Sequence, residues 1–467
     1  MVLALDGPDA GPSRGANGGR RQRTRAGYGR FTRAPSGLNA LVMHYDGRSM
    51  SRRLAPLRRS LDAMPSPVES RPGLLLRDPF GYTEDVVIVP PPLVQFLRFF
   101  DGRHEEGDLA AALYKATGEL SAPGFAQRLA ETLGGGGFLE DEELARRREA
   151  RHRAFAAAPT REPVHAGEAY PTDVGDLAGL LDGWLRPRRA DEVLPPGDVY
   201  AVAAPHVSPE GGFRSYASAY SALPEDAASR TVVVLGTSHY GAPERFGITR
   251  KPYVTPFGPA GTDLAVVDRL VAAGGEALVV EDYCHAVEHS IEFQVVFLQH
   301  RLGPGVRIVP VLCGPFATAT SGPGRPEDDP GVARFVDALG ELHAREGKGL
   351  LWVLGVDLAH VGRRYGDEVV ARAGVGPLAE VEERDRLRIA ALAAGDADGF
   401  WELVRERGDD LKWCGASPLY AFLKATAPAR GVLLRYEQWN IDPASVVSFA
   451  ALACGRGEAA PPGEGGA

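Results

Sequence analysis

The feature that most constrains the fold is a regular alternation, beyond residue 160, of short β-branched segments with segments of helical period. Each β-branched segment ends in a loop of small residues, and the next segment repeats apolar residues every three or four positions. This alternation is typical of an α/β fold, with a central sheet and helices on both faces. The predicted strands are 198–204, 231–236, 306–312, 350–355, 432–436 and 446–452, and the predicted helices are 215–223, 263–273, 290–302, 331–345, 382–393 and 418–425.

A smaller module precedes this region. Apolar runs at 74–76 and 86–89 predict two strands, and three amphipathic helical stretches, a glycine run and a further strand at 138–140 follow. This order predicts a small winged-helix-like α+β domain at 68–145. Winged helices can bind DNA, but the module is acidic and has no basic face before residue 146, which favours contact with protein.

The other segments differ in composition. Residues 1–67 are rich in Arg, Gly, Ser and Pro without an apolar period, which predicts a disordered basic extension. Residues 146–160 are expected to form an Arg- and Ala-rich linker, 161–456 the α/β domain, and 457–467 a disordered tail.

Charge and cysteine content exclude several classes. Lys and Arg number 52 against 61 Asp and Glu, and the first 60 residues hold twelve Arg and three Asp, leaving 40 basic and 58 acidic residues in the rest. This acidic balance opposes nucleic-acid binding. Four scattered cysteines form neither a disulfide framework nor a zinc knuckle, and no apolar run reaches the roughly 18 residues of a membrane span. We therefore expect a cytoplasmic protein without membrane attachment.

Common catalytic fingerprints are absent or out of context. The chain has no dinucleotide-binding, Walker or G-x-S-x-G motif. Residues 285–289 spell H-x-x-E-H, a zinc-protease signature that requires both histidines on one continuous helix. Because the apolar helical period begins only after His289, we expect His285 in a loop, which disfavours the protease alternative.

Polar side chains gather where the predicted strands end. Ligands of open α/β sheets bind beyond the carboxyl ends of the strands, where the loops converge. A single histidine or cysteine there is often only structural, but five loops or helix starts carry such residues, which favours a functional crevice. These residues are His206, His239, Asp357 with His360, His289 with Glu292, and Cys414.

Seven blocks stand out in this region: "EPVHAGEAYPTDVGDLAGLLDGWL", "APHVSPEGG", "LGTSHYG", "EHSIEFQ", "IVPVLCG", "DLAH" and "CGASPL". Together they resemble the Memo family, whose bacterial members are called AmmeMemoRadiSam system protein B. They occur in the family's order and cover about 160–455, nearly two thirds of the chain. The resemblance implies a fold similar to that of class III extradiol dioxygenases. The stretch from "FDG" to "GGFLE" in the preceding module resembles PqqD-like peptide-binding domains.

The resemblance also implies a metal site. The family holds its metal with two histidines and a cysteine, which here correspond to His206, His239 and Cys414. The related dioxygenases use two histidines and a carboxylate on Fe(II). Replacing the carboxylate by a thiolate favours iron or copper over Mg²⁺ or Ca²⁺, and Zn²⁺ also fits these ligands.

Further roles follow from the same resemblance. His360 resembles the acid/base histidine of the dioxygenases, with Asp357 as the residue expected to orient it. His289 and Glu292 are expected beside the metal ligands or facing the substrate. The family's "PHAGY" is replaced here by residues 205–209, so substrate contacts beside the first ligand differ.

Two functions remain open. The first is a metal-dependent oxidoreductase acting on a small or peptide-borne substrate. The second is a non-catalytic protein that uses the same crevice for metal binding, peptide binding or redox signalling. The family name implies a radical SAM protein and an AMMECR-type protein as partners, and the N-terminal module is expected to recruit a peptide.

Overall fold

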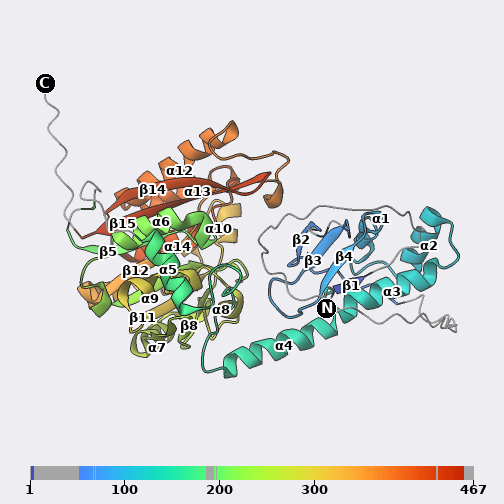
Figure 1. Cartoon of the computed structure of the whole chain (residues 1–467), viewed down its shortest axis with the longest axis horizontal. Helices are drawn as coiled ribbons and strands as arrows, with labels where there is room; N and C mark the ends of the chain where they lie inside the picture. Colours follow the sequence, from blue (N-terminus) through green and yellow to red (C-terminus); the bar gives the residue numbers. More distant parts are fainter. Residues whose placement is uncertain are drawn as a thin grey trace, which may run out of the picture. The chain divides into compact units, whose positions relative to one another are not determined.

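The structure is a computed structural model that describes residues 2–4, 52–66, 68, 70–185, 194–195, 197–426 and 430–456. The chain divides into two compact units, residues 1–153 and 154–467, and each is described by itself. Figure 1 shows the two units, with helix α4 (Glu142–Ala157) crossing the boundary in sequence between them.

The N-terminal unit contains an antiparallel three-stranded sheet of β2, β3 and β4, to which β1 adds in parallel. Apolar side chains of the sheet and helices form the core of this unit. Val87, Leu109 and Leu129 belong to this core and have no exposed surface. The elements are β1 (Val2–Ala4), β2 (Asp62–Pro65), β3 (Leu74–Arg77), β4 (Val86–Val89), α1 (Pro91–Val94), α2 (Glu106–Thr117) and α3 (Ala122–Gly135).

This unit begins earlier in the sequence than residue 68, the predicted boundary. Leu54 is buried in its core, and Arg58 forms a buried ion pair with Asp78 at 2.7 Å. Arg58 also donates a hydrogen bond to the carbonyl oxygen of Gly137. Arg58, which the sequence places in the predicted disordered extension, is therefore part of the interior. Residues 5–51 and 457–467 lie outside the described residues, so the predicted extension and tail stay predictions there.

The C-terminal unit is built on a mostly parallel sheet whose main order is β10-β7-β11-β6-β12-β5-β15-β13. At its centre β11, β6, β12 and β5 run parallel, and β15 pairs antiparallel with β5. The strands are β5 (Val199–Ala204), β6 (Thr231–Thr237), β7 (Phe246–Ile248), β8 (Tyr253–Thr255), β9 (Gly258–Thr262), β10 (Leu278–Val280), β11 (Arg307–Cys313), β12 (Leu350–Gly355), β13 (His360–Gly362), β14 (Arg430–Asp442) and β15 (Ser445–Gly455).

Helices cover both faces of this sheet (Figure 1). Alternate residues of β6 point to opposite faces, so Val233 and Leu235 pack in one apolar cluster and Val232 and Val234 in the other. The predicted α/β class is confirmed. The helices are α5 (Val174–Trp184), α6 (Pro209–Ser221), α7 (Leu264–Ala273), α8 (Cys284–Val287), α9 (Glu292–Leu302), α10 (Ala317–Ser321), α11 (Pro330–Glu346), α12 (Pro377–Ala394), α13 (Ala397–Arg405) and α14 (Ala416–Thr426).

The six predicted strands correspond to β5, β6, β11, β12, β14 and β15; the bounds of β12 are as predicted, and one or both ends of the other five are shifted. The short strands β7 to β10 have no sequence signal, because three to five residues are too few to show a period. Helix α6 begins at Pro209, six residues before the predicted start at 215. Proline suits the first helical position because its fixed φ is already helical, although the next three residues are one Glu and two Gly and show no apolar period.

Three adjacent strands end together and create the edge that carries the site. Gly355 at the end of β12 lies opposite Ala204 of β5 and Gly236 of β6. A Cβ atom on Gly355 would lie 2.3 Å from the carbonyl oxygen of Ser290. Glycine therefore lets the loop at residues 288–291 cross directly over the strand ends, which brings its side chains to the same edge.

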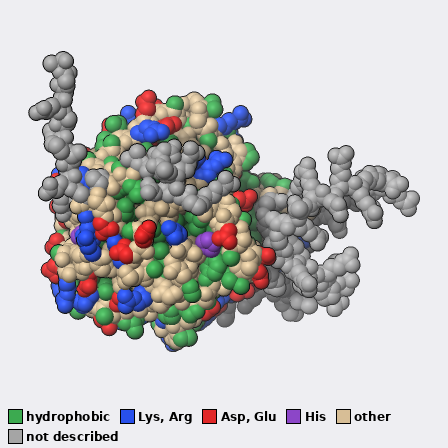
Figure 2. Space-filling model, turned by 60° about the vertical axis from the view of Figure 1, so that its left-hand side comes forward, with side chains coloured by type: hydrophobic (Ala, Val, Ile, Leu, Met, Phe, Trp, Pro, Cys, Tyr) green, Lys and Arg blue, Asp and Glu red, His purple; other side chains and the backbone are tan. Residues whose placement is uncertain are grey.

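The surface gives two further observations. None of the helices in the described part of the chain combines the length and apolarity needed to span a membrane. On the face drawn in Figure 2, acidic and basic side chains are interspersed without a continuous basic patch.

Candidate metal centre

His206 follows β5 and is almost fully buried, at 2% exposure. Its backbone N–H donates to Asp357 Oδ1 at 2.9 Å, and its Nδ1 lies 2.9 Å from the carbonyl oxygen of Gly355. Because a carbonyl oxygen only accepts, Nδ1 carries a proton. Nε2 is therefore the nitrogen available to a metal ion.

His239 follows β6 and is fixed by Glu288. The backbone N–H of His239 donates to Glu288 Oε2 at 2.8 Å, and its Nδ1 lies 3.1 Å from Oε1. Glu288 has no exposed surface, whereas the His239 side chain is 28% exposed. A carboxylate on Nδ1 leaves Nε2 free and raises its basicity, as in carboxylate–histidine–metal arrangements.

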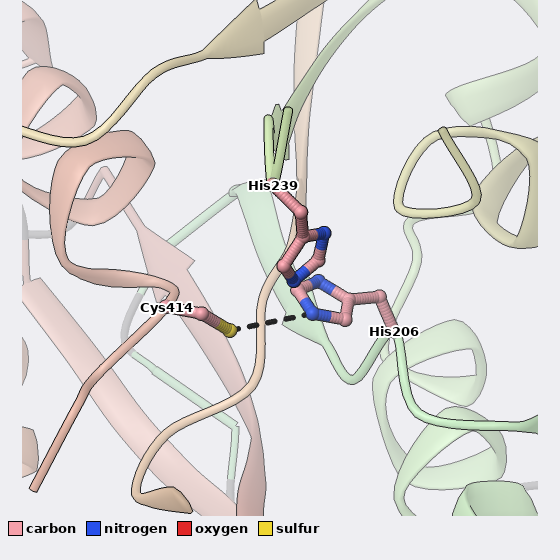
Figure 3. Close-up of side chains that lie close together, drawn as sticks. All are labelled: His206, His239 and Cys414. Atoms are coloured by element: carbon pink, nitrogen blue, oxygen red, sulfur yellow. Dashed lines mark hydrogen bonds between the residues drawn. The ribbon is translucent and has the colours of Figure 1, made fainter. Parts of the chain in front are cut away.

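Cys414 comes two residues before α14 and completes a three-residue cluster (Figure 3). Its Sγ lies 3.3 Å from His206 Nε2. Burial raises the pKa of Cys414, but the charges of His206 and His360 and hydrogen bonds from His206 and His239 outweigh it and lower the pKa to about 5. The thiolate form, which is the metal-binding form, is thus favoured near neutral pH.

The donor set fits a transition metal. One ligand atom each from His206, His239 and Cys414 lie within 4.8 Å of one another. Two imidazole nitrogens and a thiolate suit zinc, iron or copper, whereas Mg²⁺ and Ca²⁺ prefer oxygen ligands. The exposed side of His239 leaves the cluster open to a further ligand.

His360 begins β13, and its own loops orient it. Its Nδ1 lies 2.9 Å from the carbonyl oxygen of Leu358 and 3.1 Å from that of Lys412. Nδ1 therefore carries a proton, and Nε2 is free to accept one. The sequence predicts that Asp357 orients His360, but the Asp357 carboxylate instead accepts from the backbone N–H of His206 and lies 3.6 Å from Nε2 of the His206 ring. Two carbonyl oxygens take the role expected of the carboxylate.

His289 joins the cluster. Its ring stacks on that of His239 at a centroid distance of 5.1 Å and lies edge-on to His206 at 5.2 Å. Burial lowers the pKa of His289 to about 4 despite hydrogen bonding to Glu288, so the ring is neutral at pH 7. Its side chain is 27% exposed, which places a neutral imidazole on the open side of the cluster.

Glu292 was expected beside the metal ligands or facing the substrate, but it lies elsewhere. It is fully buried, forms an ion pair with Arg161 and accepts hydrogen bonds from the Tyr170 hydroxyl and from the backbone N–H of His165. Arg161 also donates to the carbonyl oxygens of His285 and Glu288, each at 2.7 Å. Glu292 and Arg161 thus tie the segment 161–170 to the loop that carries Glu288.

The H-x-x-E-H motif does not form a protease site. His285 lies in the short helix α8, not in a loop as predicted, and its Nδ1 is 2.6 Å from the Tyr253 hydroxyl. The helix ends before Glu288, whose φ and ψ of −81° and 139° are extended. As expected, the two histidines of the motif do not share one continuous helix.

Glu288 and Arg161 are the residues of the site that sequence reasoning missed. Glu288 stands inside the H-x-x-E-H motif, so the available signal was assigned to protease chemistry. Arg161 precedes the block at 162–185, and the partners that connect it to the site, His285, Glu288 and Glu292, lie more than 120 residues away in sequence. No local pattern indicates such a pairing.

The C-terminal unit is therefore an α/β protein with a two-histidine, one-cysteine candidate metal site at the carboxyl edge of its sheet. The sequence model of the family described as "Memo-like protein" matches residues 161–453, more than half of the chain. The chain belongs to the Memo family.

Three curated relatives, each named as a MEMO1 family protein, show how far the similarity extends. The protein of Aquifex aeolicus is 26% identical over 81% of this chain and 95% of its own length. Those of Methanopyrus kandleri and Thermus thermophilus are 28% and 29% identical, each over 64% of this chain and over 99% and 83% of their own lengths. The Aquifex alignment is too long for residues 161–453 alone, so it includes part of the N-terminal unit.

The Arg161–Glu292 pair predicts a large stability effect. Replacing Arg161 by Ala leaves Glu292 buried without its counter-charge, which costs about 3–5 kcal/mol of unfolding free energy. Urea unfolding of Arg161→Ala and wild type measures the difference. The matched control is Arg386→Ala, because Arg386 pairs with Glu382 on the surface and its loss should cost about 1 kcal/mol or less. Equal losses in the two variants would contradict the anchoring role of Arg161.

The carboxylate on His239 predicts an effect on metal affinity. In Glu288→Gln the neutral amide no longer raises the basicity of His239, so we expect Zn²⁺ affinity to fall about 10- to 100-fold. Competition with a chelator measures it. Glu281→Gln is the control, because Glu281 bonds Thr249 and Lys251 instead of the cluster residues. Unchanged affinity in Glu288→Gln would be incompatible with this role.

Proposed function

We propose that this protein binds one iron or copper ion through His206, His239 and Cys414 and acts as a dioxygenase-like oxidoreductase on a small or peptide-borne substrate. Zn²⁺ also fits the same ligands. The observation that carries the proposal is the convergence of the three ligand atoms within 4.8 Å of one another. The two Nδ1 hydrogen bonds support it, because they leave each Nε2 available.

A bound Fe(II) or copper ion would supply O₂ and substrate activation at this position. The chain contributes the surrounding chemistry. Nε2 of His360 accepts a proton from the substrate, because Nδ1 is occupied by two carbonyl oxygens. The neutral His289 lines the open side, where a substrate hydroxyl could bond it. Ring cleavage of a catechol inserts both atoms of O₂, so it requires no separate reductant.

The alternative is a non-catalytic protein that uses the same centre for metal binding, peptide binding or redox signalling. Both alternatives need the metal, and only the first needs His360. Partners of the radical SAM and AMMECR types, with the N-terminal unit recruiting a peptide, remain part of the proposal. Metal content and turnover therefore have to be measured separately.

Metal content tests the ligand set. Anaerobically purified wild-type protein should contain about one iron or copper per chain, and Cys414→Ala should lose most of it, because two imidazoles alone make a weak site. Elemental analysis gives the ratio. Cys454→Ala is the control, since Cys454 is a buried thiol on β15 with a raised pKa. Full metal content in Cys414→Ala would refute the assignment of the thiolate.

Turnover tests the role of His360. If the oxidoreductase proposal is right, His360→Ala keeps its metal and loses about 10²- to 10⁴-fold in kcat for O₂ consumption with catechol as the probe. An oxygen electrode measures the rate, and His104→Ala, an exposed histidine of the N-terminal unit bonded to Asp101, is the control. A metal-loaded wild type that consumes no O₂ with catechols or cell extract would support the binding alternative.

A further inference from the structure

A buried carboxylate lies behind the candidate metal centre, on helix α12. Asp385 has no exposed surface and accepts three hydrogen bonds. Its Oδ1 accepts from Nε1 of Trp413 at 2.7 Å, and its Oδ2 accepts from the hydroxyls of Tyr436 at 2.8 Å and Ser448 at 2.6 Å. Three donors around one carboxylate satisfy an ionised acceptor, so this is a completed polar network and not an isolated buried charge.

Two of the three donors connect Asp385 to the loops of the site: Trp413 belongs to the loop of Cys414, and Ser448 holds the loop of His360. Trp413 immediately precedes Cys414. Ser448 Oγ accepts from the backbone N–H of Ala359 at 2.9 Å, and its backbone N–H and carbonyl oxygen bond Ala359 and Leu358. Asp385 therefore connects the loop that supplies the thiolate with the loop that supplies His360.

The loop before Cys414 requires such an anchor. Arg407, Asp409 and Lys412 have φ values of 56°, 51° and 53°, in the left-handed region that side chains with a Cβ rarely adopt. Residues in this region persist only where neighbouring contacts hold them. Besides the bond to Asp385, the Trp413 ring lies 5.2 Å from the guanidinium of Arg388, one turn further along α12.

We propose that Asp385 is a positioning residue of the metal centre, which fixes the Cys414 thiolate through Trp413 and the His360 loop through Ser448. The inference rests on the proposed metal site and deepens it. Asp385 hydrogen-bonds Trp413, Tyr436 and Ser448 and neither Cys414 nor His360, so its loss acts through the geometry of the residues it holds. The third donor, Tyr436, bonds the same carboxylate but lies on β14, a strand that carries none of the proposed ligands or catalytic residues. The Tyr436 bond is therefore a contact of Asp385 that does not lead to the site.

The test uses the full-length protein loaded with Co²⁺, whose thiolate-to-metal absorption reports the Cys414–metal bond without any turnover. We expect Asp385→Asn to lower Co²⁺ affinity by about tenfold or more and to shift this absorption. Trp413→Phe, which removes the Nε1–H donor together with part of the buried indole ring, should reproduce both changes. Tyr436→Phe is the matched control, because it removes one hydrogen bond from the same carboxylate and should leave affinity and absorption unchanged.

The His360 loop is tested separately by histidine-selective NMR of the Zn²⁺-loaded protein. Asp385→Asn and Ser448→Ala should shift the His360 imidazole signals, and Tyr436→Phe should not. If Asp385→Asn does not fold, Trp413→Phe and Ser448→Ala carry the test, with circular dichroism as the check of folding. Variants indistinguishable from Tyr436→Phe would overturn the role of Asp385. A wild type that binds Co²⁺ without thiolate absorption would instead overturn the proposed metal centre.

Discussion

The carboxylate of Glu288 is buried without exposed surface and accepts hydrogen bonds from His239 and from the backbone N–H of His289. An unpaired carboxylate in this position would cost several kcal/mol, so the two histidines and the carboxylate stabilise one another. The loop around Glu288 is in turn held by Arg161, which donates to the carbonyl oxygens of His285 and Glu288. The position of His239, a candidate metal ligand, thus depends on a chain of buried polar contacts that begins at Arg161, 127 residues before Glu288 in the sequence.

The candidate site has two halves that are anchored independently. Glu288 and Arg161 hold the half with His239 and His289, and Asp385 holds the loops of Cys414 and His360. His206 links the halves, because its Nε2 meets Cys414 while its ring lies against His239 and His289.

The sequence predicts the sheet well because its central strands are buried on both faces and are continuously apolar. It also predicts which residues meet at the strand ends, since parallel strands ending at one edge bring His206 and His239 together. The partners of those residues were harder to predict. Asp357 was assigned to His360 because the two are neighbours in "DLAH", yet the backbone turns Asp357 towards His206 across the sheet. Glu288 and Asp385 act through contacts between distant segments, which no local period encodes.

The charges of the cluster explain why a cation can enter without rearranging it. Burial lowers the pKa of His206, but the charges of Asp357 and Cys414 outweigh it and raise the pKa to about 9. In the metal-free protein, a proton on Nε2 of His206 therefore balances the negative charge of the Cys414 thiolate. A bound metal cation would take over this role. The Nδ1 protons of His206 and His239 stay in place in both states, because Gly355 and Glu288 offer only acceptors. Exchange of a proton for a metal ion at the candidate site would thus keep the Nδ1 hydrogen bonds of both imidazole rings, which is the preorganisation that a metal centre requires.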